Sequence, residues 1–348
     1  MNRPLKDIVN ELERTSETTP QYIEAVISAL RSAIPFDASC CTAVDPKTLL
    51  SIGAVTDDLI ESIHPQLFEL EYTDDDVNQY ETLIKTSQTA AILSEAVKED
   101  LKRSKRYRMI LEPAGFGDEL RAILLNKGEC WGYLTLLRKI GQPPFNEKER
   151  TLVASLAPII GRHLQRLRHN RPKKDMFHMK HVGGILILSE DLIPLSCNQA
   201  ALHWLNVLRG WEKIDIAVLP RPVRAVCSRA VAETDSPAKT VISIPGQCFL
   251  SIKASRLDGL GPSEQIAVSF EPASSAETIP LIADAYGLSE REKDIAYQII
   301  RGLSTKDIAD DLHISAYTVQ DHLKSIFLKA EAGNRRELIW KLLDDVLE

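Results

Sequence analysis

The sequence lacks the segments that place a protein in or across a membrane. Its 348 residues contain no uninterrupted apolar run long enough to cross a bilayer. The first residues, Met1 to Asp7, have neither the apolar core nor the cleavage site of a signal peptide. We therefore expect a soluble protein that stays in the cytoplasm.

The motifs of enzyme chemistry are also missing. The sequence contains no Gly-x-Gly-x-x-Gly, Walker loop, His-Glu-x-x-His or Gly-x-Ser-x-Gly, and no catalytic-cysteine signature. Two aspartate runs, Asp57-Asp58 and Asp74-Asp75-Asp76, could suggest a phospho-receiver, but Asp74-Asp75-Asp76 follows a predicted helix and leads to polar sequence instead of ending an apolar strand. We interpret them as solvated loop charges and expect no catalytic residue.

Cysteine is scarce and is not arranged as a ligand set. None of the six cysteines forms a Cys-x-x-Cys pair or has the spacing of a metal site. They are Cys40, Cys41, Cys130, Cys197, Cys227 and Cys248. We expect reduced, buried thiols, no metal and no cofactor, although an unidentified small-molecule effector stays possible.

What the sequence does contain is a series of helix start and stop signals in residues 285–348. Ser289 with Glu292 and Ser304 with Asp307 have the spacing of capping boxes, and Ser315 is a further N-cap. Gly302 ends the first of these helices, and Gly333 with Asn334 separates the third from a fourth. The pattern predicts an all-α domain of four helices. The second and third, joined by His313-Ile314, form a helix-turn-helix.

The third predicted helix has two opposite faces. At helical spacing its core face comprises Val319, Leu323, Ile326, Phe327 and Ala330. Its other face, which we call the outward stripe, comprises Tyr317, Gln320, Asp321, Lys324 and Leu328. Most of these side chains can bond to base edges or phosphates in a major groove. The alternative is an ordinary solvated helix face.

This region resembles the LuxR/GerE-type helix-turn-helix family of bacterial regulators. The resemblance rests on Leu288-Ser289-Glu290-Arg291-Glu292, on Gly302 to Ala309, and on Leu312 to Lys324. It implies that Gln320, Asp321 and Lys324 face the groove, that Thr318 and His322 lie near phosphates, and that the fourth helix pairs two subunits. The candidate DNA-binding residues are Lys306, Ser315, Tyr317, Thr318, Gln320, Asp321, His322 and Lys324.

Two features of this sequence depart from an ordinary DNA-binding domain. Many family members carry a lysine or arginine where this chain has Gln320, and the carboxylate of Asp321 can accept only from a base amino group such as that of cytosine. From Leu288 onward there are nine Lys and Arg residues against twelve Asp and Glu. Contacts from Lys and Arg to phosphate supply much of the affinity for DNA. We therefore expect a dimer to bind DNA with the affinity that a single domain is too acidic to reach.

The fourth predicted helix carries more apolar residues than a three-helix core needs. We therefore expect a dimer contact there. Its candidate residues are Leu338, Ile339, Leu342, Leu343 and Val346.

Residues 1–168 are predicted to form an α+β domain. A helix over 21–34 precedes a strand over 38–44, further helices, a hairpin with strands at 120–125 and 131–137, and a long helix from Phe145 to about Leu167. The Trp131-Gly132-Tyr133-Leu134 segment with Pro144-Phe145 resembles a GAF domain, which implies either a ligand pocket or a dimerisation module. If strand residues alternate, Trp131 shares a side with Tyr133 and Thr135. The candidate pocket residues are Cys41, Ala122, Leu124, Trp131, Tyr133 and Thr135.

Three further segments complete the multidomain organisation. Residues 183–272 resemble a PAS domain of α+β architecture: two strands lead to Asn198 as a helix cap, a helix over 223–233 follows, and three strands close the domain. Residues 169–182 form a basic linker. Residues 273–284, beginning Ala273-Ser274-Ser275, form a second linker.

These features predict a one-component transcription regulator. GAF-like and PAS-like sensors would control a homodimer that binds double-stranded DNA at a pseudo-palindromic site, with RNA polymerase as a possible further partner. The alternative is a sensor or scaffold whose helix-turn-helix no longer binds DNA. A sequence-specific footprint distinguishes the two.

Overall fold

The computed structural model describes residues 4–16, 18–73, 76–168, 183–232, 238–244, 249–257 and 264–343. They belong to two compact units. The first comprises residues 1–167, 178–242 and 251–271, and the second comprises 168–177, 243–250 and 272–348. The predicted basic linker, 169–182, lies outside the described residues.

The N-terminal domain of the first unit is built on a five-stranded sheet in the order β2-β1-β5-β4-β3. Its strands are β1 (Ala38–Val44), β2 (Ser51–Thr56), β3 (Ala90–Ile92), β4 (Phe116–Asn126) and β5 (Glu129–Lys139). All neighbouring strands are antiparallel. The predicted bounds of β1 are confirmed, and both hairpin strands extend further than expected.

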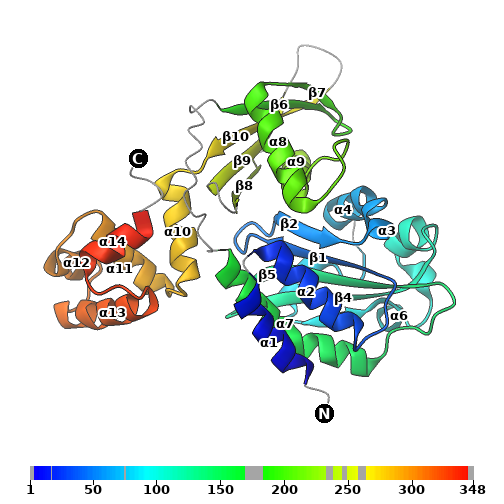
Figure 1. The fold of residues 1–348 in the computed structure, drawn as a ribbon, viewed down its shortest axis with the longest axis horizontal. Coiled ribbons are helices and arrows are strands. Elements are labelled where there is room, and N and C mark those ends of the chain that lie inside the picture. The colour runs from blue at the N-terminus through cyan, green and yellow to red at the C-terminus, as the bar shows by residue number, and fades with distance from the viewer. Residues whose placement is uncertain are drawn as a thin grey trace. The chain divides into compact units, whose positions relative to one another are not determined.

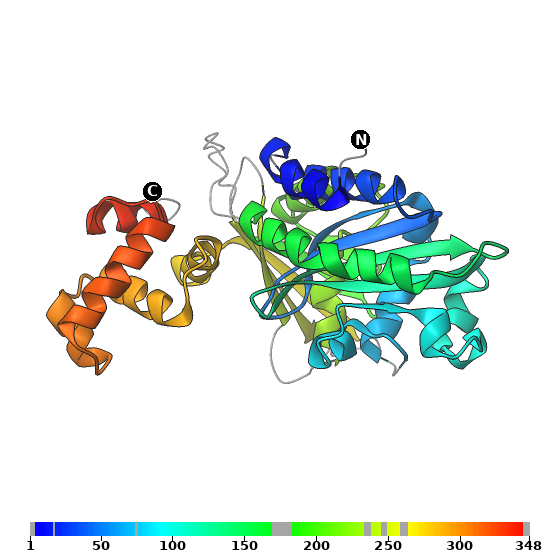
Figure 2. The same ribbon diagram turned by 90° about the horizontal axis from the view of Figure 1, so that it is seen from below.

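Helices cover both faces of this sheet (Figures 1 and 2). On one face α1 (Leu5–Thr15), α2 (Thr19–Arg31) and α7 (Glu147–Leu167) enclose an apolar core. Over the other face lie α3 (Asp58–Glu61), α4 (His64–Thr73), α5 (Tyr80–Lys85), α6 (Leu93–Ala96), η1 (Leu101–Arg103) and η2 (Tyr107–Leu111). The order of helix, strands, helices, hairpin and long helix is the α+β, GAF-like one that the sequence predicts.

A β-bulge in β5 changes which side chains share a face. Leu125 pairs with Cys130 but Ile123 pairs with Tyr133, so β5 has one residue more than β4 over this interval. Trp131 therefore turns towards α7 and packs in the same core as Leu134. The prediction that Trp131 shares a side with Tyr133 and Thr135 is wrong, because alternation does not continue through a bulge.

Two of the aspartates interpreted as loop charges are structural anchors. The Asp76 carboxylate accepts hydrogen bonds from Ser104 Oγ at 2.9 Å and from the Arg106 amide at 2.7 Å, and its side chain is 2% exposed. Asp57 accepts from the amide and hydroxyl of Ser39, both at 2.7 Å. Each joins segments distant in sequence, which corrects the interpretation as solvated charge for these two residues.

A second five-stranded sheet follows in the order β7-β6-β10-β9-β8. Its elements are β6 (Gly184–Ser189), β7 (Pro194–Cys197), α8 (Gln199–Glu212), α9 (Arg221–Ala232), β8 (Ala238–Ser243), β9 (Phe249–Leu257) and β10 (Gln265–Pro272). Asn198 caps α8 by accepting from the Ala201 amide at 2.9 Å, as predicted. If the strands of each sheet are numbered from one in chain order, both sheets have the order 2-1-5-4-3. The PAS-like assignment of this domain stays a prediction.

Within the first unit the two sheet domains are in contact. Gly53 in β2 has φ +148°, and a Cβ there would lie 2.5 Å from the indole ring of Trp211 in α8. Glycine is therefore required by both its backbone conformation and the close approach of the ring. Lys213 adds an ion pair with Glu24 of α2 at 2.5 Å. Helix α9 packs on α4 and β2.

The second unit contains the C-terminal helices α10 (Ser275–Ala285), α11 (Glu290–Ile300), α12 (Thr305–Asp311), α13 (Ala316–Lys329) and α14 (Arg335–Leu343). The predicted N-caps Ser289, Ser304 and Ser315 are confirmed. Helix α10 replaces most of the predicted linker 273–284: Ser274 and Glu277 form a capping box, and the helix packs on α11 and α14. The linker prediction is wrong over these residues, because Ser274 is a helix cap and serine is as typical of helix caps as of linkers.

Candidate DNA-binding surface and candidate ligand cavity

Helix α13 has the two faces that its sequence predicts. Val319, Ile326 and Ala330 are fully buried, Leu323 is 7% exposed and Phe327 is half-buried. Every residue of the outward stripe is exposed, with Tyr317 at 70% and Leu328 at 81%. The buried face packs against α11 and α12. The outward stripe is therefore free within this unit to meet another molecule.

Charge on the outward stripe is partly neutralised within the helix. Lys324 Nζ lies 3.1 Å from the carboxylate of Asp321, one turn earlier, and both side chains are exposed. Such exposed pairs at i,i+3 contribute only a few tenths of a kcal/mol, about 0.2–0.5. A phosphate or base edge can thus displace Asp321 from Lys324 at little cost.

The start of α13 is fixed by its cap and by the preceding turn. Ser315 Oγ accepts from the Thr318 amide at 3.0 Å and lies 2.8 Å from its hydroxyl. His313 in the turn adopts φ +53°, a left-handed conformation that lets α12 and α13 cross. Lys306 is exposed near the start of α12, and His322 is half-buried beside the stripe.

Glu292 positions α13 relative to α11. The sequence predicts only its role in capping α11. Its carboxylate accepts from Ser325 Oγ at 2.6 Å and from Lys329 Nζ at 2.5 Å, as well as from the Ser289 amide at 2.6 Å. Burial by itself would raise the pKa of Glu292, but the hydrogen bonds from Lys329, Ser325 and Ser289 lower it to about 2. The charged form is therefore kept at neutral pH. Its partners on α13 could not be found from local spacing.

Helix α14 buries part of the predicted dimer contact within its own unit. Leu338 and Leu342 are fully buried in the single chain, so they belong to the core rather than to a subunit interface. The prediction assumed a three-helix core and did not include α10, which packs on α14. Ile339 and Leu343 are half-buried, while Trp340 is 57% exposed. Val346 lies outside the described residues.

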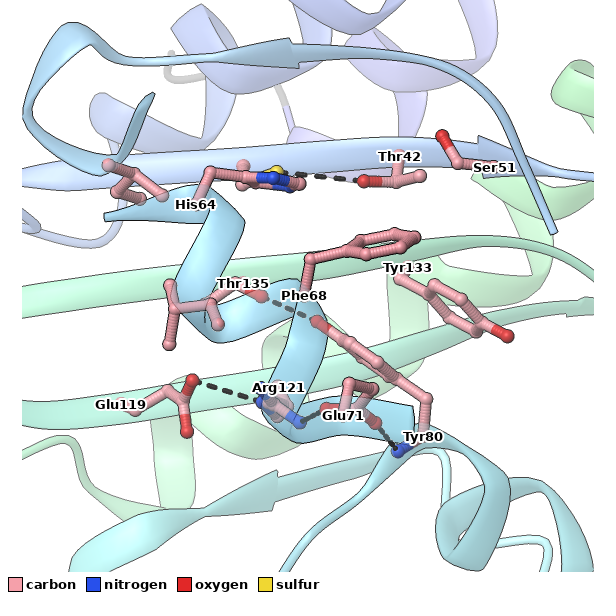
Figure 3. A pocket seen from close by; sticks show the side chains of 13 residues that line it. Thr42, Ser51, His64, Phe68, Glu71, Tyr80, Glu119, Arg121, Tyr133 and Thr135 are labelled. Atoms are coloured by element: carbon pink, nitrogen blue, oxygen red, sulfur yellow. Dashed lines mark hydrogen bonds and ion pairs between the residues drawn. The ribbon is translucent and has the colours of Figure 1, made fainter. Parts of the chain in front are cut away.

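A cavity lies between the first sheet and α4. Its atom-free volume is about 630 Å³, counted out to its open mouth. Figure 3 shows the rings of Phe68, Tyr80 and Tyr133 around it, with His64 along one side. The lining residues are Cys40, Thr42, Ser51, Ile60, His64, Leu67, Phe68, Glu71, Tyr80, Glu119, Arg121, Tyr133 and Thr135.

Only two of the six candidate pocket residues line this cavity. Tyr133 and Thr135 do so. Cys41, Ala122, Leu124 and Trp131 lie on the opposite face of the sheet, in the core beneath α1, α2 and α7. The prediction is wrong for these four, because the sequence does not reveal which face of a sheet covered on both sides carries the cavity.

Buried charges at the base of the cavity neutralise one another (Figure 3). The Arg121 guanidinium contacts Glu71 at 2.6 Å and Glu119 at 3.0 Å. Glu119 also accepts from Arg106 at 2.7 Å. Burial raises the pKa of Glu119, but Arg106 and Arg121 outweigh burial and hold it below its ordinary value. Arg121 stacks on Tyr80, whose hydroxyl lies 2.5 Å from Thr135 Oγ1.

The thiols and the possible metal ligands form no further site in the part of the chain that the structure describes. Cys40, Cys41, Cys130 and Cys227 are buried and free, whereas Cys197 is exposed, which corrects the expectation of burial for that residue. Cys248 lies outside the described residues. No group of His, Cys, Asp and Glu among those described is placed to hold a metal ion. None of the described helices is long and apolar enough to cross a bilayer.

Comparison with known proteins identifies the family to which the helix-turn-helix belongs. Residues 286–342 match the family described as bacterial regulatory proteins, luxR family. Transcriptional regulatory protein DesR of Bacillus subtilis (strain 168) is 31% identical over 175 residues, which are 45% of this chain and 87% of DesR. This chain belongs to the LuxR family. It is a DNA-binding transcription regulator.

Other similar proteins are more distant or match over less of their length. The monoamine regulon transcriptional regulator of Klebsiella aerogenes is 33% identical over 91 residues, 26% of this LuxR-family chain and 37% of that protein. Among solved structures, a GAF domain/HD domain protein from Geobacter sulfurreducens aligns with 47% of this chain and 94% of its own, at 12% identity and a TM-score of 0.31.

Proposed function

We propose that this chain is a one-component regulator that binds a pseudo-palindromic DNA site as a homodimer, with α13 in the major groove of each half-site. The observation that carries the proposal is the outward stripe of α13, which is exposed along the helix while the opposite face is buried. The caps and the Glu292 contacts fix that helix in its unit, so its side chains would meet DNA in a preset orientation.

The test compares two single substitutions that remove one positive charge each. Lys324→Ala should weaken binding to the specific site by about 1–3 kcal/mol if the lysine contacts a base, without unfolding the domain. Arg301→Ala is the matched control, because Arg301 is exposed at the end of α11 and lies off the outward stripe. Footprinting at physiological salt measures both. Equal binding by the two variants would contradict this docking.

The dimer of this proposal uses the half-buried apolar residues of α14. Ile339 and Leu343, with the exposed Trp340, are the described residues of that helix still available to a second copy. Val346 is proposed to extend the same contact. A two-fold pair is needed because one domain has too few positive charges for strong phosphate binding. RNA polymerase is a further candidate partner of the DNA-bound dimer.

We also propose that the cavity beside α4 receives a small-molecule effector. Its exposed lining surface is mostly apolar and includes the rings of Phe68, Tyr80 and Tyr133, beside polar side chains that can orient a ligand, which is the chemistry of small-molecule sites in proteins. Thermal-shift screening of the whole chain against metabolites is the test, with Tyr133→Ala as the variant whose response should be lost. If a metabolite stabilises the unaltered chain and the Tyr133→Ala variant equally, the effector site does not lie in this cavity.

The ion pair between Lys324 and Asp321 favours a second candidate for α13, in which this helix is a sensor or scaffold contact and does not read the DNA sequence. In that case Asp321 would keep the outward stripe from carrying net positive charge. Asp321→Asn distinguishes the candidates: a DNA-reading α13 should change its base preference, whereas a scaffold should gain no specific footprint.

A further inference from the structure

Helix α4 has the cavity on one side and the second sheet domain on the other. His64, Phe68 and Glu71 line the cavity. The rings of His64 and Phe68 are stacked, with centroids 5.8 Å apart and planes inclined by 27°. The other side of α4 packs on α9 of the same unit. A change in the cavity that moves Phe68 therefore acts directly on His64.

His64 joins α4 to two buried arginines of α9. Arg221 Nε lies 3.3 Å from His64 Nε2, and Arg224 Nη1 lies 3.2 Å from His64 Nδ1. Both guanidinium groups also contact the carboxylate of Glu61 in α3. Arg221 is 1% exposed and Arg224 is 5% exposed. The contact is thus shielded from water. Electrostatic interactions are stronger in the protein interior than at the surface.

The imidazole of His64 cannot accept from both arginines at once. Burial, followed by the positive charges of Arg221 and Arg224, lowers its pKa well below the ordinary value. The ring is therefore neutral and has one acceptor nitrogen and one N–H. One tautomer accepts from Arg221 and the other from Arg224, so the ring has two alternative bonding arrangements. Moving the ring towards one arginine and away from the other favours the tautomer that accepts from the nearer one.

The chemistry of the cavity restricts what can occupy it. Arg121 is neutralised by Glu71 and Glu119, so a charged ligand would find no free partner and would lose its hydration. Tyr80 and Tyr133 stack with centroids 4.0 Å apart, and the ring of Phe68 lies beside them. The rings of the lining offer flat apolar surface on which a planar ring can pack. An uncharged aromatic ring meets these conditions.

We propose that the cavity binds a small uncharged aromatic molecule and that its presence is transmitted through Phe68 and His64 to Arg221 and Arg224 of α9. This transmission rests on the proposed effector cavity. The ligand need only favour one arrangement of His64 over the other, because a ligand that binds both equally shifts nothing.

The experiment uses the full chain with phenol, benzoate and benzylammonium as single-ring probes that differ in charge. Phenol at millimolar concentration should raise the melting temperature, whereas the two ions should not. With phenol bound, amide hydrogen exchange in residues 221–232 should change by about fivefold, the effect of roughly 1 kcal/mol on local opening. Arg224→Met should remove that change in exchange while phenol still binds.

Arg229→Met is the matched control. Arg229 lies on the same helix, but its guanidinium donates to the Thr48 carbonyl at 3.2 Å. Its variant should retain the response of α9. Binding of phenol without a change in α9 would overturn the transmission and leave the effector cavity standing. Binding of benzoate as strongly as phenol would overturn the ligand class. Failure of phenol to bind would overturn the inference, and if no metabolite binds either, the effector cavity itself fails.

Discussion

The carboxyl group of Glu212 is held in an environment that favours its neutral form. Glu212 is the last residue of α8 and is 9% exposed. One of its oxygens accepts from the Arg221 amide at 2.9 Å, while the other has no hydrogen-bond partner. Burial raises the pKa of Glu212 to about 7, although Arg221 and Arg224 act in the opposite direction. This carboxyl group therefore titrates close to neutral pH, next to the contact between the two sheet domains.

We expect Glu212 to make the first unit less stable as pH rises from about 4.3, the ordinary pKa of a glutamate, to about 7. Over that range the unfolded state has released the proton and the folded state has not, so stability is present at the lower pH and is lost as pH passes the folded pKa. Glu212→Gln should remove up to about 3 kcal/mol of this decline.

Urea unfolding at several pH values between 5 and 8 measures the effect. The control is Glu271→Gln, because Glu271 is exposed and pairs with Lys253 at 3.2 Å. If Glu212→Gln and Glu271→Gln retain the same pH slope as the unaltered chain, the carboxyl at position 212 is not the titrating group.

At the scale of secondary structure, α10 changes what α14 can do. Ile279, Leu281 and Ile282 of α10 are buried, and Asp284 of the same helix is bound by Lys293 of α11. The helix therefore completes the core that also encloses Leu338 and Leu342. Any subunit contact through α14 has to use the residues that this core leaves uncovered.

Two charge substitutions on α14 should have different outcomes. Leu342→Glu should unfold the C-terminal domain, since a buried charge without a partner costs several kcal/mol. Ile339→Glu should leave the domain folded and abolish cooperative occupancy of two half-sites. Circular dichroism reports folding, and gel-shift titration on one and on two half-sites reports cooperativity. A folded, cooperative Ile339→Glu variant would place the dimer contact outside α14.

The elements that were predictable from sequence are those set by neighbouring residues. Ser289, Ser304, Ser315 and Asn198 each cap a helix through bonds to amides three residues on, so local spacing suffices. The bulge before Tyr133 was not predictable, because it depends on how β5 pairs with β4. The same holds for Arg121 with Glu71, which are 50 positions apart and are brought together only by the fold.

At the scale of the whole molecule, sensing and DNA binding must obey linkage. If a ligand in the cavity changes the affinity for DNA, DNA must change the affinity for that ligand by the same factor. This equality holds whatever path connects the sites. It therefore tests the proposed regulator without assuming how its units move.

We expect phenol, or a tighter effector found by screening, to change the affinity for the specific site by about 5–150-fold, the usual range of coupling between sites. Titrating the effector with and without DNA should give the same factor. Lys324→Ala should lower the affinity for DNA. It should leave unchanged the factor by which the effector alters that affinity, because the substitution removes a DNA contact and not the coupling between the sites. Unequal factors would mean that the DNA and effector measurements report different states of the protein.

The contact of Gly53 with Trp211 also has an evolutionary consequence. Because no side chain fits between the backbone of β2 and the indole ring, positions 53 and 211 are not free to vary independently. A relative that acquires even an alanine at the first position must replace the tryptophan with a smaller residue or separate its sheet domains. Relatives that keep the tryptophan should also keep the glycine, whereas the glycine can remain after the tryptophan is lost, because its φ of +148° requires glycine independently of the ring.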